Sequence, residues 1–251
     1  MAELIVLGSA ASVPDGGHDT VGLALRGPGW AVLIDCGGSS LHKLARFGVA
    51  LEEIRAVILT HRHADHIYGL PMLIQGLWLG EREASLPIYG PAQTLDRARQ
   101  LLALFDLDER EGMFDQGWHP VPLREARRVL TVKDVQITST PVIHAGNDTL
   151  ALRFDNTASQ RSIVYSSDTE PCPELVRLAA GANLLLHEAT GEHPGHSSPA
   201  EAAEIAREAG VLQLALIHYP VRGVNLDAWR RRATGFPGPV SLARDGDIYP
   251  L

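Results

Sequence analysis

Short apolar runs with the length of β-strands, separated by turn residues, fill the first quarter of the chain. Gly27, Pro28 and Gly29 separate the second run from the third, which predicts an antiparallel meander. A segment that starts with two serines and ends at Gly48 predicts a short helix before the fourth run. The four runs are residues 3–8, 21–26, 30–37 and 54–60.

The rest of the chain alternates helical and strand-like patterns. Residues 69–80 predict a helix if Pro71 lies in its first turn, where its missing N–H does no harm. Residues 91–105 predict an amphipathic helix. Further strands are predicted over residues 119–123, 134–142, 150–155, 161–168, 213–218 and 239–243, and an arginine-rich helix over 225–233. Strand meanders followed by strand and helix alternation predict two mixed sheets with helices packed outside, an α/β class.

Length and composition fit a compact globular protein. The chain has 251 residues, 45% hydrophobic and 21% charged, and we expect a single domain over residues 1–251. The N-terminus lacks a basic leader, and no segment approaches the roughly 20 apolar residues that span a bilayer, so a cytoplasmic protein without a membrane partner is expected. Cys36 and Cys172 are predicted to be buried free thiols.

The net charge of −8 weighs against a protein that holds nucleic acid through a broad basic face. Two arginine clusters, residues 123–128 and 228–235, are interpreted as solvated surface rather than as a track for phosphates.

Residues 60–66, "THRHADH", place three histidines and an aspartate within six positions directly after a strand. Side chains two apart on an extended segment point the same way, so His61 and His63 can reach one metal ion. Asp65 and His66 face other directions and suit a second ion. Imidazole and carboxylate are ligands of Zn²⁺ and similar metals, whereas a histidine-rich surface loop is the alternative interpretation.

Three more candidate ligands follow predicted strands further along the chain. His144 ends "STPVIH", Asp168 follows "IVYSS", and His218 ends "QLALIH". Each side chain can project from the edge of a sheet into a shared cleft. Asp168 has two carboxylate oxygens and could bridge both ions.

The motif "HRHADH" is similar to the HxHxDH signature of the metallo-β-lactamase superfamily. Several other stretches resemble its ribonuclease Z branch: "VLGSAASVP", "GLPMLIQGLWLGEREASLPIYGP", "SSDTEPCPEL", "HEATGEHPGHSSPAEAAEIAREAG" and "ARDGDIYPL". The resemblance covers nearly the whole chain. It implies a four-layer αβ/βα sandwich with a dinuclear site, usually of zinc, between the sheets.

The resemblance also implies how the two divalent ions, Zn²⁺ or alternatively Mn²⁺, would be held. One ion would take His61, His63 and His144, the other Asp65, His66 and His218, and Asp168 would bridge them. The assignment made from the residues alone agrees with these sets.

His196 precedes a segment in which Ser198 is a credible N-cap, Glu201 its capping-box partner and Gly210 the stop. It therefore lies beside a helix N-terminus, where a phosphate is favoured. In the resembling family the matching histidine acts in proton transfer.

Three other residues have weaker support. His187 is interpreted as core or as a residue that supports a ligand. Glu188 is a candidate to orient a ligand or His196. His18 could line the mouth of the cleft.

Together these residues predict metal-assisted phosphodiester hydrolysis. Two ions about 3.5 to 4 Å apart would hold a bridging hydroxide, with Asp65 as its proton acceptor and His196 as the donor to the departing oxygen. A dinuclear hydrolase of a sulfate ester, lactone or β-lactam is the alternative, and a non-catalytic metal-binding module is the third class.

The substrate is a small phosphodiester or RNA. Ribonuclease Z enzymes that process transfer RNA typically carry a protruding arm between the third metal histidine and the bridging aspartate. Here 23 residues separate His144 from Asp168 and predict two strands joined by a turn, so no arm fits. This favours small phosphodiesters over transfer RNA 3′-processing. The residues do not reveal the oligomeric state, and the resemblance allows a homodimer, since dimers are usual among similar proteins.

Overall fold

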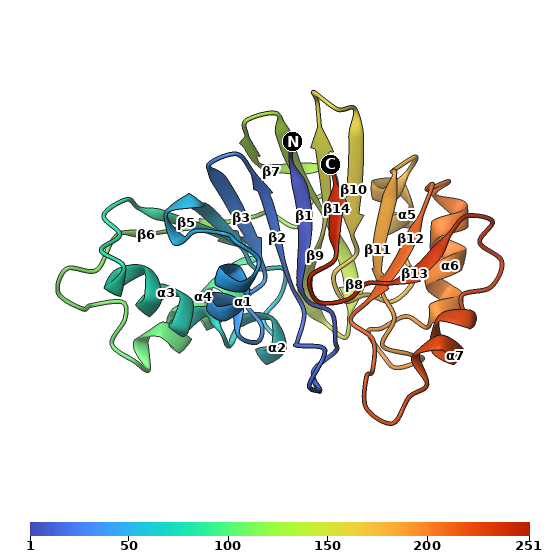
Figure 1. Cartoon of the computed structure of the whole chain (residues 1–251), viewed down its shortest axis with the longest axis horizontal. Coiled ribbons are helices and arrows are strands. Elements are labelled where there is room, and N and C mark those ends of the chain that lie inside the picture. The colour runs from blue at the N-terminus through green and yellow to red at the C-terminus, as the bar shows by residue number, and fades with distance from the viewer.

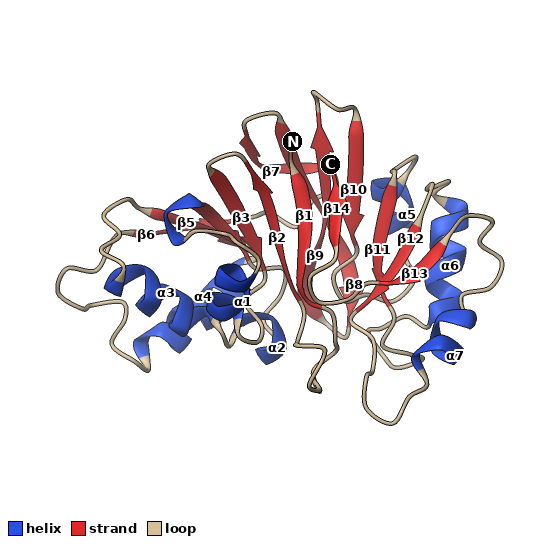
Figure 2. Ribbon diagram, viewed as in Figure 1, coloured by secondary structure: helices blue, strands red, loops and turns tan.

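Two β-sheets lie face to face in the middle of the molecule, and helices cover the outer face of each (Figures 1 and 2). A computed structural model describes all residues, 1–251. Each sheet has seven strands. The αβ/βα sandwich expected from the sequence is therefore confirmed.

The first sheet has the order β14-β1-β2-β3-β4-β5-β6. Strands β1, β2 and β3 form an antiparallel meander, and β3 to β6 run parallel. Strand β14, close to the C-terminus, pairs antiparallel with β1. The strands are β1 (Glu3–Gly8), β2 (Gly22–Gly27), β3 (Trp30–Ile34), β4 (Ile54–Ile58), β5 (Leu86–Gly90), β6 (Gln116–Pro120) and β14 (Ile248–Pro250).

The second sheet repeats this plan, with the order β13-β12-β11-β10-β9-β8-β7. Strands β7 to β10 are antiparallel to one another, and β10 to β13 run parallel. The strands are β7 (Arg127–Val132), β8 (Val135–His144), β9 (Asn147–Asn156), β10 (Arg161–Tyr165), β11 (Leu184–Glu188), β12 (Leu214–Ile217) and β13 (Val240–Leu242).

The helices lie in two groups, one against each sheet (Figure 2). Helices α1, α3 and α4 pack on the first sheet through one apolar cluster, and α5 and α6 pack on the second through another. A third apolar cluster fills the space between the sheets. The helices are α1 (Ser40–Arg46), η1 (Leu51–Glu53), α2 (Ala64–Ile67), α3 (Leu70–Leu79), α4 (Ala92–Ala103), α5 (Pro173–Ala179), α6 (Pro199–Glu208) and α7 (Leu226–Arg231).

Local signals in the sequence position several of these elements correctly. Pro71 lies in the first turn of α3, and α6 begins with the capping box of Ser198 and Glu201. Gly48 and Gly210 follow α1 and α6 with φ of 70° and 63°, the left-handed conformation that glycine adopts without strain. Both cysteines are free and buried, as expected.

Some elements differ from the prediction. The strand expected over 119–123 lies three residues earlier, as β6. Strands β5, β7, β11 and β14 and helix α5 were not assigned individually from the sequence. No helix in the structure combines the length and the apolar character needed to cross a membrane.

Candidate metal centre

The ends of four strands bring the expected ligands together. The histidine loop follows β4 of the first sheet, whereas β8, β10 and β12 of the second sheet end at or just before His144, Asp168 and His218. Strands β8, β10 and β12 run in the same direction, because β9 is antiparallel to both β8 and β10, and β10 to β12 are parallel. Their carboxyl ends therefore meet at one edge of the sheet, opposite the loop.

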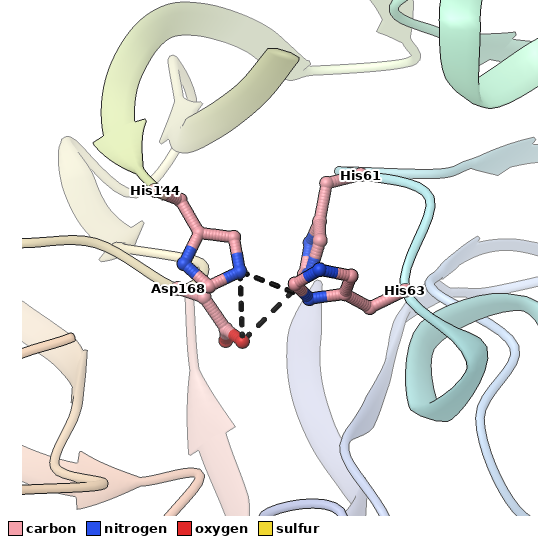
Figure 3. A group of neighbouring side chains, drawn as sticks. All are labelled: His61, His63, His144 and Asp168. Atoms are coloured by element: carbon pink, nitrogen blue, oxygen red, sulfur yellow. Dashed lines mark hydrogen bonds and ion pairs between the residues drawn. The ribbon is translucent and has the colours of Figure 1, made fainter. Parts of the chain in front are cut away.

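Four side chains form the first group (Figure 3): His61, His63, His144 and Asp168. His63 Nδ1 lies 3.0 Å from His144 Nε2. Asp168 Oδ2 lies 3.7 Å from His61 Nε2 and 3.8 Å from His144 Nε2. Ligand atoms at about 2.0–2.1 Å from a tetrahedral ion are roughly 3.3 Å apart, so these separations fit a single ion.

Asp65, His66 and His218 form the second group. His218 Nε2 lies 3.3 Å from Asp65 Oδ2. Asp168 Oδ2 is 3.5 Å from both His66 Nε2 and His218 Nε2, so the same carboxylate oxygen lies against both groups. The structure thus brings together all seven residues that the sequence proposed as ligands, in the two sets expected.

Each histidine has one ring nitrogen directed at the cluster and the other in contact with a group outside it. Such outer partners fix the orientation of a ligand ring. The contacts are His61 Nδ1 to Thr60 Oγ1 (3.2 Å), His63 Nε2 to Asn147 Nδ2 (3.1 Å), His66 Nδ1 to Asp35 Oδ2 (2.9 Å), His144 Nδ1 to the Gly195 carbonyl (2.6 Å) and His218 Nδ1 to Thr190 Oγ1 (2.8 Å).

Three inner atoms of the cluster are buried and have no hydrogen-bond partner: His61 Nε2, His66 Nε2 and Asp168 Oδ1. A buried polar atom without a partner is costly, about 1–3 kcal/mol. Bound cations would satisfy all three at once, and the imidazole and carboxylate donors match zinc and its neighbours. The residues therefore fit a pair of divalent ions.

Burial lowers the pKa of three histidines in the first group. The effect is largest for His61, where the neighbouring His66 adds to it. It also lowers the pKa of His63 and of His144. A lowered pKa keeps the imidazole neutral, which is the form that binds a metal.

The carboxylates make the centre attractive for positive charge. Burial opposes a charge on His66, but Asp168 and Asp35 outweigh it and raise the pKa well above its usual value. Burial likewise opposes ionisation of Asp65 and Asp168, but contacts with His218 and His66 lower both pKa values. The centre therefore favours cations, whether protons on imidazole or metal ions.

Three residues at the centre have the left-handed backbone conformation that glycine adopts most easily. Asp35 (φ 59°), Ser167 (φ 52°) and His218 (φ 50°) each lie just past the end of a strand. Such a conformation costs about 1–3 kcal/mol in a non-glycine residue and persists only where surrounding contacts hold it. The strand ends are bent at the positions where side chains turn into the cluster.

A buried hydroxyl connects the two groups, and it was not predicted from the sequence. Thr60 Oγ1 donates to Asp35 Oδ2 (2.9 Å), accepts from Ser167 Oγ (2.9 Å) and contacts His61 Nδ1 (3.2 Å). Asp35 in turn holds His66. The end of β3, where "LIDCG" follows an apolar run, is the sequence signal that could have identified Asp35.

His196 lies beside the cluster rather than within either set of expected ligands. Its Nδ1 donates to Glu188 Oε1 (2.9 Å), and its ring stacks on His218 with centroids 5.9 Å apart. Burial opposes a charge on His196, but the Glu188 carboxylate outweighs it and raises the pKa. Of the two partners expected for Glu188, a ligand or His196, the hydrogen bond goes to His196. His187 is buried, and its Nδ1 contacts the Glu188 carbonyl.

The N-terminus of α6 is less open to a phosphate than the sequence suggested. The Ser197 N–H donates to Glu188, the Ser198 N–H donates to Glu201, and the Glu201 N–H donates to Ser198 Oγ. The protein itself thus occupies these three donors.

The loop between β1 and β2 contacts the centre through Ser12, whose Oγ donates to Asp65 Oδ2 (2.6 Å). Asp245 holds both ends of this loop, since its carboxylate accepts from the N–H of Ser9 (3.0 Å) and from that of Asp19 (2.9 Å). His18, expected at the cleft mouth, contacts Asp15 in this loop and is not part of the cluster.

One side of the cluster is open to solvent. His61, His66, His144, Asp168 and His218 are at most 2% exposed. His63 and His196 are half-buried, and so are Arg62 and Asn147 next to His63. A substrate would therefore approach from the side of His63 and His196.

Comparisons with known proteins agree with this geometry. Residues 31–219 match the family model of the beta-lactamase superfamily domain. Ribonuclease Z of Mycobacterium sp. strain KMS is 32% identical over 98% of this chain and 94% of its own. That alignment runs over 276 positions, more than the 251 residues here, so the relative has segments without a counterpart in this chain.

Solved structures resemble the whole chain. The metallo-beta-lactamase fold protein YhfI from Bacillus subtilis is 27% identical with a TM-score of 0.82, covering 99% of this chain and 98% of its own. Human tRNase Z, short form, has a TM-score of 0.78 at 23% identity, covering 99% of this chain and 100% of its own, and this similarity concerns the fold alone.

Proposed function

Because this chain belongs to the metallo-β-lactamase superfamily, in its ribonuclease Z group, we propose that it is a dinuclear metal-dependent phosphodiesterase. The observation that carries the proposal is the position of Asp168 Oδ2, 3.5–3.8 Å from four histidine nitrogens of the two groups. A carboxylate shared in this way suits two adjacent cations.

We propose Zn²⁺ as the native metal, with Mn²⁺ as the alternative. His61, His63 and His144 would hold one ion, Asp65, His66 and His218 would hold the other, and Asp168 would contribute to both. When bound, the ions act as Lewis acids that lower the pKa of water and neutralise phosphoryl oxygens.

Asp65 and His196 are the residues we assign to proton movement. Ser12 and His218 fix Asp65 Oδ2, and the lowered pKa keeps the carboxylate ionised, so it can accept a hydrogen bond from the attacking water. This position next to the water is the reason that we assign Asp65 as the acceptor of its proton. Glu188 holds His196 through Nδ1, which leaves Nε2 to donate to the departing oxygen. The raised pKa of His196 keeps it protonated closer to neutral pH.

We propose small phosphodiesters as substrates in preference to precursor transfer RNA. Strands β9 and β10, which connect His144 to Asp168, are joined by residues 157–160 alone, so no arm extends from this part of the fold. The net charge of −8 also disfavours binding to a long polyanion.

Parallel assays with the Zn²⁺- or Mn²⁺-loaded protein test the proposal. The substrates are bis-p-nitrophenyl phosphate, p-nitrophenyl sulfate, a lactone and a precursor transfer RNA. We expect hydrolysis of the phosphodiester with the highest kcat/KM. Hydrolysis of the sulfate or the lactone alone would replace the proposal with the other ester classes. Specific 3′-end cleavage of the RNA at low enzyme concentration would overturn the preference for small substrates.

We further propose a homodimer. Tyr68, between α2 and α3, and Met72 and Leu79 of α3 are 47–64% exposed and give an apolar surface that a second copy would cover. Light scattering after size-exclusion chromatography measures the mass, and a monomer at all concentrations would refute the dimer.

A further inference from the structure

Arg62 lies between two of the proposed metal ligands and has no role in the mechanism above. On the extended segment its side chain leaves the backbone opposite to those of His61 and His63. Its Nε donates to Asn147 Oδ1 (2.9 Å), at the start of β9. The guanidinium group is thereby held at the open side of the cluster.

The remaining guanidinium nitrogens of Arg62 have no hydrogen-bond partner within the protein, and no carboxylate lies within 4 Å of it. Three other half-buried arginines have more partners. Arg26 pairs with Glu3, and Arg153 pairs with Asp155. Arg82 donates to three backbone carbonyls. A fixed guanidinium without an anionic partner matches the geometry that binds phosphate or carboxylate.

Asn147 holds Arg62 close to the metal centre. Its side-chain amide contacts Arg62 on one side and His63 Nε2 (3.1 Å) on the other, and it also donates to the His144 carbonyl (3.3 Å). One amide group therefore separates the guanidinium from a proposed ligand. Arg62, Asn147 and His63 are all half-buried, so each keeps part of its surface accessible to solvent.

The positive charge of the Arg62 guanidinium is important for binding an anionic substrate, because the protein around it is acidic. The chain has a net charge of −8, and Asp65 and Asp168 lie in the centre itself. His196, the proposed proton donor, is not among the neighbours of Arg62 and belongs to the second sheet's side of the cluster. A substrate held across the centre would thus present its departing group to His196 and a different part to Arg62.

We propose that Arg62, held by Asn147, binds a second anionic group of the substrate, a terminal phosphate next to the phosphodiester that is cleaved. This inference rests on the proposed phosphodiesterase function and adds a subsite to it. The preferred substrate is therefore a small phosphodiester that carries an additional terminal phosphate.

Three dinucleotides test the subsite: a diadenosine monophosphate (ApA), the same compound with a 5′-terminal phosphate, and the same compound with a 3′-terminal phosphate. We expect the wild-type protein to show a kcat/KM about tenfold higher for one of the phosphorylated compounds than for ApA, mainly through KM. In Arg62→Leu this ratio should fall to near one. Arg62→Lys keeps the charge but loses the bond to Asn147, and should retain part of the preference.

Arg124→Leu is the matched control, because Arg124 is exposed, lacks a side-chain hydrogen bond and lies outside the centre. It removes the same charge and should leave the ratio at its wild-type value. The metal content of Arg62→Leu, measured by elemental analysis, should remain two ions per chain, which distinguishes a lost subsite from a disturbed His63.

A preference for the phosphorylated compound that survives in Arg62→Leu would overturn the proposal, as would a wild-type protein that hydrolyses ApA without any preference. Neither result would affect the phosphodiesterase function. If the wild-type protein hydrolyses neither bis-p-nitrophenyl phosphate nor any dinucleotide, the proposed function fails, and the subsite that rests on it fails too.

Discussion

The two sheets are built on the same plan but contribute to the centre in different ways. Each has an antiparallel meander followed by parallel strands with helices outside. The first sheet supplies four ligands from one loop after β4, whereas the second supplies His144, Asp168 and His218 from three separate turns.

The difference concerns how each set is held in place. The ligands of the loop are neighbours in sequence, and His61 and His66 share the buried support of Thr60 and Asp35. In the second sheet, His144 and His218 rely on different partners, Gly195 and Thr190. The four predictions that follow measure this difference, from the largest effect to the smallest.

Replacement of Asp168 by asparagine should have the largest effect, because its Oδ2 lies against both groups. In Asp168→Asn we expect the metal content to fall from two ions to one or none per chain and kcat to fall about a thousandfold. Elemental analysis and bis-p-nitrophenyl phosphate hydrolysis measure the two quantities. His63→Ala, which affects the first group alone, should keep one ion. Two ions retained in Asp168→Asn would contradict the shared position.

Loss of His196 should reduce turnover without loss of metal. His196→Ala removes the proposed proton donor, so kcat for a dinucleotide should fall about a hundredfold or more. The loss should be much smaller with bis-p-nitrophenyl phosphate, whose departing group needs little protonation. Stopped assays of both substrates give the comparison, and elemental analysis should still find two ions. A lower metal content would identify His196 as a ligand instead.

Thr60 tests the shared support within the first sheet. Thr60→Val keeps the shape but removes the hydroxyl that contacts His61, Asp35 and Ser167, and we expect metal affinity to fall about thirtyfold at both ions. Thr60→Ser should restore most of it. Competition with a chromogenic chelator measures the affinities. Equal affinities in the valine and serine variants would mean that packing, not the hydroxyl, is what matters.

Thr190 tests the separate support within the second sheet. Its hydroxyl contacts His218 alone among the ligands, accepting from Nδ1 and donating to the carbonyl. Thr190→Val should therefore lower the binding affinity for one ion about tenfold and leave the affinity for the other unchanged. The same chelator competition measures both affinities. If the affinities for both ions fall as much as in Thr60→Val, the ligands of the two sheets are not supported in the different ways proposed.

The same contrast explains how much could be predicted from the sequence. The loop at residues 60–66 is compact in sequence, so its chemistry is visible without a structure, and His144, Asp168 and His218 follow from their positions after apolar runs. Capping and turn residues such as Ser198 and Gly210 also act locally, so they located α6 correctly.

Features that depend on distant partners could not be predicted. Strand β14 has three residues and exists because it pairs with β1 at the other end of the chain. Asn147 and Thr190 are ordinary polar residues in sequence, and only the fold places them against His63 and His218. Asp35 is marked in the sequence by its position at the end of an apolar run alone, and its role depends on Thr60 and His66.

The carboxylate of Asp245 has a consequence for access to the metals. Because it accepts from both Ser9 and Asp19, it fastens the two ends of an Ω-loop near a single point. Ala10 and Ala11 are also paired with Asp19 and Tyr219, so the part of the loop without such ties is residues 12–18, whose tip is exposed and carries Ser12. Release of Ser12 from Asp65 would therefore need only this tip to move, on the nanosecond to microsecond timescale of surface loops, and neither sheet would have to rearrange.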